Sequence, residues 1–213
     1  MKRLISVSFG LVLVTIVANA QPLYFQEGKA LSVAAGYSNV HMNVDNFQAA
    51  FVEATWYPSY SLGWEFSARV EIGQDFLSFE PIGLIGLPMW MYSSSHKMGR
   101  DSNLVGALLS IASAKCPIAL GDYGMFEITP YWSLLKLTRL YDDKFRINGD
   151  VGVQLKLFPL AYLYWANTLY ISGFIQSNWA YGKDKNYYGR YNVKDNRSDF
   201  YGYSWGFQIG YYF

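Results

Sequence analysis

The last fifteen residues, Asp199 to Phe213, read DFYGYSWGFQIGYYF. From Tyr201 to Phe213 every second residue is large and aromatic or aliphatic, and the residues between them are mostly small or polar. A period of two is typical of a β-strand with one apolar face and one polar face. Such a strand needs an apolar environment along the whole of one side, which predicts either a protein core or a lipid bilayer there.

The same alternation occurs inside the chain, most clearly from Leu62 to Gly73. One face of this stretch carries six apolar residues, and the other carries Glu65, Arg69 and Glu71. Three charges facing a soluble core would be costly unless every one of them were paired. In a membrane barrel the charges would face the lumen and the apolar residues would face lipid.

With its aromatic C-terminal residue, the closing stretch resembles the last strand of small bacterial outer-membrane β-barrels, with a Bacteroidetes-like character. The resemblance is good at Tyr211 and Phe213 and looser upstream, where the glycines are at a different offset. It implies that these two residues belong to the signal read by the barrel-assembly machinery. The part of the chain that carries it covers residues 30–75 and 124–213.

The start of the chain predicts a cleaved signal peptide over residues 1–20. Lys2 and Arg3 precede an apolar run from Leu4 to Val17, and Ala18-Asn19-Ala20 is a small-x-small cleavage site. We therefore expect a single barrel domain over residues 21–213, exported to the outer membrane. Without Lys2 and Arg3, 17 − 2 = 15 basic residues face 16 acidic ones, which argues against a nucleic-acid partner.

Composition agrees with a membrane barrel. Aromatic residues make up 19% of the chain and charged residues 15%, whereas soluble domains average about 25% charged. After residue 20 the chain has no run of the ~20 apolar residues that a membrane helix requires. Cys116 is the single cysteine, so no intrachain disulfide can form, and it is best interpreted as a small apolar residue.

The alternation predicts an all-β, antiparallel up-and-down transmembrane barrel of about eight strands. The expected strands are Ala30–Tyr37, Phe47–Tyr57, Leu62–Gly73, an irregular one within 79–92, Met125–Leu137, Phe145–Leu157, Ala166–Tyr181 and the closing strand. Ser38 to Asn46 is expected to be a loop, and Pro130 with an outward Lys136 predicts a bulge or register change. Leucines and alanines at three- and four-residue spacing predict a short helical insertion around residues 102–116. Because successive strands run in opposite directions, the number of strands before this insertion places it at the end of the barrel that holds both termini.

Two groups of residues are candidates for chemistry. His41 with Ser38 or Asp45 could act as a general base on a serine, as in lipid A-modifying barrels, although a solvent-exposed loop histidine is the simpler interpretation. The second group is the set of predicted lumen charges, interpreted as an ion path or, preferably, as a salt-bridge network that fills a narrow barrel. Its members are Glu53, Glu65, Arg69, Glu71, Glu127, Arg146, Asp150 and Lys156.

The sequence contains no zinc-ligand pattern and no glycine-rich phosphate loop, so we expect no metal and no cofactor. The expected function is that of a monomeric, non-catalytic outer-membrane barrel with a role in envelope integrity, adhesion or partner docking. Its expected partners are outer-membrane lipid, lipopolysaccharide and, during biogenesis, the assembly machinery. A lipid A-modifying enzyme and a soluble periplasmic barrel that binds a lipophilic ligand are the alternatives.

Overall fold

A computed structural model describes residues 23–26, 28–42, 45–57, 65–82, 113–120, 124–140, 145–163, 165–180 and 201–213. The expected signal peptide lies outside these ranges, and so do residues 58–61, between two expected strands, and residues 182–197, which precede the closing strand. In the described part, a short helical turn α2 (Leu23–Gln26) precedes the strands. No helix among the described residues has the length and hydropathy needed to cross a membrane.

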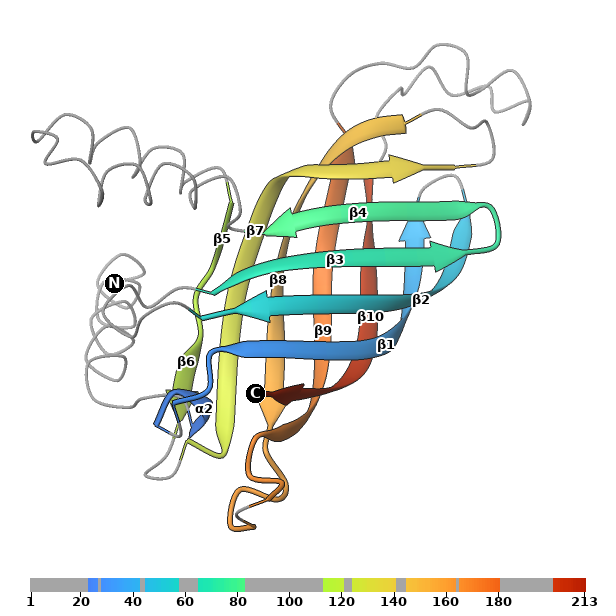
Figure 1. The fold of residues 1–213 in the computed structure, drawn as a ribbon. Helices are drawn as coiled ribbons and strands as arrows, with labels where there is room; N and C mark the ends of the chain where they lie inside the picture. The colour runs from blue at the N-terminus through green and yellow to red at the C-terminus, as the bar shows by residue number, and fades with distance from the viewer. Residues whose placement is uncertain are drawn as a thin grey trace, which may run out of the picture.

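The described strands form one antiparallel sheet that closes on itself (Figure 1). Eight of them make up the barrel: β1 (Leu31–Met42), β2 (Asn46–Trp56), β3 (Phe66–Gly73), β4 (Phe76–Ile82), β7 (Phe126–Arg139), β8 (Phe145–Leu157), β9 (Leu169–Ala180) and β10 (Tyr201–Tyr212). Sequential strands are neighbours, and β1 pairs with β10. The predicted eight-stranded up-and-down barrel is therefore confirmed.

The barrel closes at two very different places. Strands β1 and β10 pair continuously from Ser32↔Tyr212 to Met42↔Gly202. Strands β4 and β7 pair only over Leu77–Phe79 and Leu137–Arg139, and we call this short contact the seam. In its N-terminal part, before the seam, β7 is paired instead with two three-residue strands, β5 (Ser113–Lys115) and β6 (Ile118–Leu120).

Strand β5 extends the wall where β4 has ended. Its Ser113 faces Ser133 of β7, and on the other side the Glu65 N–H donates to the Lys115 carbonyl at 2.8 Å. The helix expected over 102–116 is therefore wrong for residues 113–115, because their backbone groups are paired with β7 and with the start of β3. Residues 102–112 of that expected helix lie outside the described ranges.

Three other expectations can be compared with the strands. The loop expected from Ser38 is wrong up to Met42, since β1 continues there between β2 and β10. The irregular strand expected within 79–92 corresponds at its start to the end of β4, and residues 83–92 lie outside the described ranges. The bulge expected near Lys136 is confirmed by a register shift between Ser133 and Lys136 against β8.

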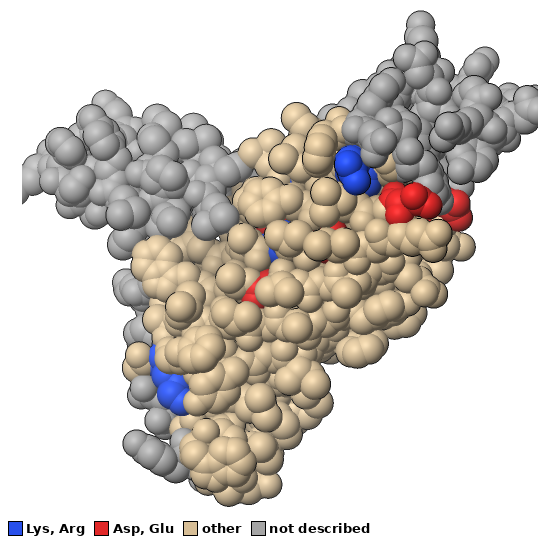
Figure 2. All heavy atoms as spheres, turned by 45° about the vertical axis from the view of Figure 1, so that its right-hand side comes forward, with Lys and Arg blue, Asp and Glu red and all other residues tan. Residues whose placement is uncertain are grey.

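Side chains alternate between the two sides of the barrel wall. In β2, Ala50, Val52 and Ala54 are exposed on the outside, while Glu53 and Thr55 are buried inside. In β10 the aromatic and aliphatic series points outward, and Ser204, Gln208 and Tyr212 point inward. The outer wall is almost free of charged residues between its two ends in the view of Figure 2, where only a few charged atoms are visible midway.

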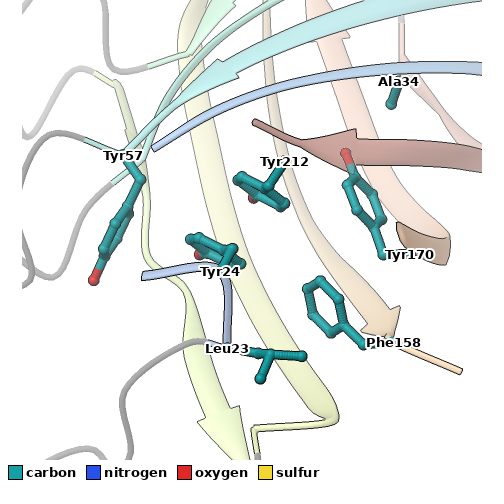
Figure 3. Close-up of a cluster of buried hydrophobic side chains, with 7 residues drawn as sticks. All are labelled: Leu23, Tyr24, Ala34, Tyr57, Phe158, Tyr170 and Tyr212. Carbon is teal, nitrogen blue, oxygen red and sulfur yellow. The ribbon is translucent and has the colours of Figure 1, made fainter. Parts of the chain in front are cut away.

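Helical turn α2 lies at the same end of the barrel as the C-terminus (Figure 1). We call this the terminal end, and the opposite one the far end. A cluster of buried side chains closes the terminal end from inside (Figure 3), and it consists of Leu23, Tyr24, Ala34, Tyr57, Phe158, Tyr170 and Tyr212. The Tyr24 and Tyr212 rings are stacked with centroids 3.7 Å apart.

Candidate functional site

The interior of the barrel contains a connected series of buried charged side chains, which we call the ion-pair chain. It begins near the terminal end, where the Lys156 ammonium lies 2.7 Å from Glu127 and 2.9 Å from Glu65. Glu65 also lies 3.7 Å from the Lys115 ammonium, and Lys115 in turn pairs closely with Glu53. Because Lys115 contacts both glutamates, strand β5 connects the part of the ion-pair chain near the terminal end with its middle part.

The ion-pair chain continues through Arg69 toward the far end. Arg69 donates from Nη2 at 2.6 Å and from Nε at 2.8 Å to the same oxygen of Glu53, and Nη1 lies 3.8 Å from Glu80. The Lys136 ammonium then lies among three carboxylates, at 3.1 Å from Glu71, 3.5 Å from Glu80 and 3.6 Å from Asp150. Acids and bases therefore alternate from Glu127, near the terminal end, to the three carboxylates around Lys136.

Arg69 is at the centre of this arrangement and is fully buried. Its guanidinium lies over the Phe174 ring, 4.4 Å from the centroid, and Nη1 donates to Gln176 at 3.3 Å. Tyr131 donates its hydroxyl hydrogen to the same Gln176 oxygen at 2.5 Å. A planar guanidinium suits this position because it can stack on a ring and donate from its edge at the same time.

Seven of the eight predicted lumen charges are buried inside the barrel. They are Glu53, Glu65, Arg69, Glu71, Glu127, Asp150 and Lys156, and each belongs to the ion-pair chain. Arg146 also lies on the inner face of β8, opposite Thr138, but it is only half-buried. The structure thus brings together residues that come from four different strands or their flanks.

Three members of the ion-pair chain were missed by the sequence analysis. Glu80 lies in a proline-interrupted stretch that reads as apolar on both sides, and Lys115 was assigned to the expected helix. Lys136 reads as outward under strict alternation, but the bulge at Leu134 and Leu135 reverses the alternation and turns Lys136 inward. An apparently outward lysine next to a suspected bulge was the available signal for this residue.

The histidine candidate is arranged differently from the expected base. His41 lies on the outer face of β1, where its ring stacks on Tyr203 with centroids 4.8 Å apart. Its Nδ1 atom is 2.8 Å from the Asn46 side-chain oxygen, and exposed Asp45 accepts a hydrogen bond from the Asn46 N–H. Ser38 is buried on the opposite face, with its hydroxyl 3.5 Å from the Ala49 carbonyl. The structure therefore does not bring Ser38 and His41 together.

The residues expected to form the assembly signal lie at the β1–β10 closure. Phe213 is exposed, its N–H donates to the Leu31 carbonyl at 2.7 Å, and its own carbonyl accepts from Ala30 at 3.2 Å. Tyr211 points outward and makes an edge contact with the Phe213 ring. Their role in assembly stays a prediction.

Two titratable groups outside the barrel strands are held in their neutral forms. Burial raises the pKa of the Tyr24 phenol well above its usual range, and the nearby carboxylates of Glu127 and Glu65 raise it further. Tyr24 therefore remains a donor, and it donates to Glu65 at 2.7 Å. Burial also raises the pKa of the Cys116 thiol to about 11, with a smaller contribution from the charge of Glu65, so the reactive thiolate is scarce at neutral pH.

Within the described ranges, no three or more histidine, cysteine, aspartate or glutamate side chains are grouped so that they could hold a metal ion. Each acid of the ion-pair chain instead has a lysine or an arginine within ion-pair distance. The arrangement can hold strands together and occupy the lumen.

No protein-family model and no curated protein sequence matches the chain. Among solved structures, the barrel is similar to Neisserial surface protein A, with 9% identity, 87% of this chain and 97% of that chain covered, and a TM-score of 0.45. It is also similar to the attachment invasion locus protein Ail of Yersinia pestis, with 7% identity, coverage of 87% and 99%, and a TM-score of 0.43. The outer membrane protein OprG from Pseudomonas aeruginosa matches with 6% identity, coverage of 87% and 96%, and a TM-score of 0.43. The narrower Bacteroidetes resemblance finds no support among these proteins.

Proposed function

We propose that this protein is an outer-membrane β-barrel with a filled, non-conducting lumen and a non-catalytic role in envelope integrity, adhesion or partner docking. The observation that carries the proposal is the combination of an apolar outer wall with the buried ion-pair chain. Both follow from the same alternation along each strand, since one face of every strand must suit the outside and the other the lumen.

The outer wall supports a bilayer environment. Its large exposed side chains include Val52 of β2, Leu137 of β7, Leu155 of β8 and Phe207 of β10, which are spread around the barrel. A soluble protein rarely exposes a contiguous apolar surface of more than a few hundred Å². A soluble periplasmic barrel with a lipophilic ligand would need the opposite arrangement, with the apolar side chains inside.

The interior supports a filled lumen. An eight-stranded barrel is only just wide enough for its side chains to fill it. Here the middle of the interior is occupied by Arg69 and by Glu53 and Gln176, which both accept hydrogen bonds from it, and all three are almost inaccessible to solvent. An open aqueous path would leave these groups hydrated, whereas their partners are other side chains.

Membrane fractionation with heated and unheated gel electrophoresis tests the location and the fold together. We expect the protein in the outer-membrane fraction, with a mobility that changes on heating. Recovery in the soluble periplasmic fraction would overturn the membrane assignment. In planar bilayers we expect no stable conductance steps from the purified protein, with a large porin as the positive control, and steady steps would contradict the filled lumen.

A lipid assay separates this proposal from the enzymatic alternative. The purified protein should leave lipid A unchanged when the product is analysed by mass spectrometry. Removal or addition of an acyl chain by the wild type, abolished in His41→Ala, would replace the non-catalytic role with an enzymatic one.

A further inference from the structure

Lys29 lies at the terminal end, between α2 and β1, and its ammonium has an unusual set of partners. It donates to the Thr168 hydroxyl at 3.1 Å, to the Asn167 side-chain oxygen at 3.2 Å and to the Tyr211 hydroxyl at 3.4 Å. The ammonium also lies 5.2 Å from the centroid of the Tyr211 ring. All of these partners are neutral.

The charge of Lys29 is therefore not balanced in the way that the interior charges are. Each of Arg69, Lys115, Lys136 and Lys156 has at least one carboxylate within ion-pair distance, whereas no carboxylate of the described residues is that close to Lys29. Lys29 is also only half-buried, so an external anion can approach it. A positive charge held by neutral oxygens at an accessible position favours an anionic ligand.

A free hydrogen-bond donor lies beside this charge. The Tyr211 hydroxyl accepts from Lys29, and no acceptor within the described part of the chain takes its own hydrogen. The Thr168 hydroxyl is different, because it already donates to the Tyr212 carbonyl at 2.8 Å. The free donor for a ligand is therefore the Tyr211 hydroxyl, which lies beside the Lys29 ammonium, whose three hydrogens already go to Asn167, Thr168 and Tyr211.

The surroundings are those of a membrane interface. The connection between β8 and β9 exposes Tyr162 by 76% and Trp165 by 73%, and the neighbouring Phe213 is 60% exposed. Tyrosine and tryptophan concentrate at the level of the lipid headgroups, where their rings contact acyl chains and their polar atoms contact water. The lysine is thus at the height at which a phospholipid carries its phosphate.

We propose that Lys29 and Tyr211 bind the phosphate group of a phospholipid in the leaflet that surrounds the terminal end, with Trp165 and Phe213 against the lipid. The inference rests on the proposed membrane location. The ammonium supplies the positive charge, and the Tyr211 phenol supplies a hydrogen bond to a phosphate oxygen. The outward faces of Tyr211 and Phe213 leave an apolar surface for the acyl chain.

Native mass spectrometry of the purified mature protein in detergent, titrated with phosphatidylglycerol, tests this site. Lys29→Gln should weaken binding of the first lipid by about fivefold or more, because one basic residue near a lipid surface contributes about 1 kcal/mol. Lys29→Arg should retain binding. Arg139→Gln is the matched control, since it removes one positive charge from an exposed position at the far end and should bind like the wild type.

Three results would overturn the proposal. The first is equal binding by Lys29→Gln and the wild type, and the second is equally tight binding of uncharged diacylglycerol, which has no phosphate. The third is competition by millimolar inorganic phosphate, which would assign the site to the free ion.

Trp165→Ala, which changes an exposed side chain, should also weaken lipid binding, and this keeps the test decisive if Lys29→Gln folds poorly. Every variant is first checked by the heated and unheated gel, so that failure of the barrel itself is distinguished from failure of the lipid site.

Discussion

The two closures of the barrel, β1–β10 and the β4–β7 seam, hold the wall together in different ways. At β1–β10 the backbone pairs without interruption over the length of both strands, and Tyr24 stacks on Tyr212 from the inside. At the seam three residue pairs remain, and β5 takes over where β4 ends. Buried and mutually paired side chains can thus hold two strands together where their backbone pairing is short.

Pro81 shows what replaces the backbone at the seam. Its carbonyl lies 3.4 Å from the hydroxyls of both Ser113 and Ser133, one from β5 and one from β7. On the far-end side of this carbonyl, the Lys136 ammonium forms ion pairs with Glu80 of β4, Glu71 of β3 and Asp150 of β8. The bulge in β7 that ends regular pairing is thus also the feature that supplies the bridging cation.

The largest effect is expected at the β1–β10 closure during assembly in the cell. Phe213→Asp should greatly reduce the amount of heat-modifiable protein in the outer membrane, because it changes the expected assembly signal on the closing strand. Tyr162→Asp is the control, since Tyr162 is an even more exposed aromatic residue at the same end but not on that strand. Equal outer-membrane levels of Phe213→Asp and the wild type would contradict the signal.

The next effect is expected at the seam. Lys136→Met should lower the free energy of unfolding by ~3–5 kcal/mol, because it leaves three buried carboxylates without their shared cation. Urea unfolding in lipid vesicles, followed by tryptophan fluorescence, measures the change. Lys136→Arg retains the charge and should lose much less stability. If Lys136→Met is as stable as the wild type, the bridging role of this lysine is wrong.

A charge placed on the outer wall tests the membrane environment that both closures share. Val52→Arg should cost ~2–4 kcal/mol at mid-strand, and Gln48→Arg on the same face of β2 near its far end should cost only ~0–1 kcal/mol. The same vesicle unfolding assay compares the two. Similar, small effects of both substitutions would indicate that this face meets water.

A glycine in β1 tests how tightly the continuous closure is packed. A Cβ atom at Gly36 would collide with the Phe207 carbonyl oxygen and would lie 2.6 Å from the Phe51 ring, so Gly36→Ala should cost ~1–3 kcal/mol. Gly173→Ala is the matched control, because a Cβ there would meet only the Gly206 carbonyl oxygen at 3.7 Å. Comparable stability of the two variants would show that β10 can shift away from β1.

The smallest effect concerns a single hydroxyl at the seam. Ser133→Ala removes the contact with the Pro81 carbonyl and the acceptor for the Leu135 N–H at 3.3 Å within the bulge. The expected loss is ~0.5–1.5 kcal/mol, as for an ordinary hydrogen bond. Amide hydrogen exchange should show faster exchange at Leu135 in this variant, and unchanged protection there would contradict the role of the hydroxyl.

The sequence by itself determined the class of fold and most of the interior. Alternation is local, so residues 199–213 and 62–73 reveal which side chains share a face without any knowledge of the neighbouring strands. That was sufficient to predict the eight-stranded barrel and to select the seven lumen charges that the structure places in the ion-pair chain. It was not sufficient for Lys136, because a bulge changes the alternation by one residue and reverses every assignment after it.

Only the tertiary structure decided which charges meet and how the barrel closes at the seam. Lys115 is separated from Glu53 by 62 residues, and no periodicity relates the two. Strand β5 is three residues long, too short for a pattern, and it forms because β7 and the start of β3 offer it backbone partners. Strand extent and register also decide that Ser38 and His41 lie on opposite faces and that Lys29 contacts Tyr211. Both depend on pairing between distant parts of the chain.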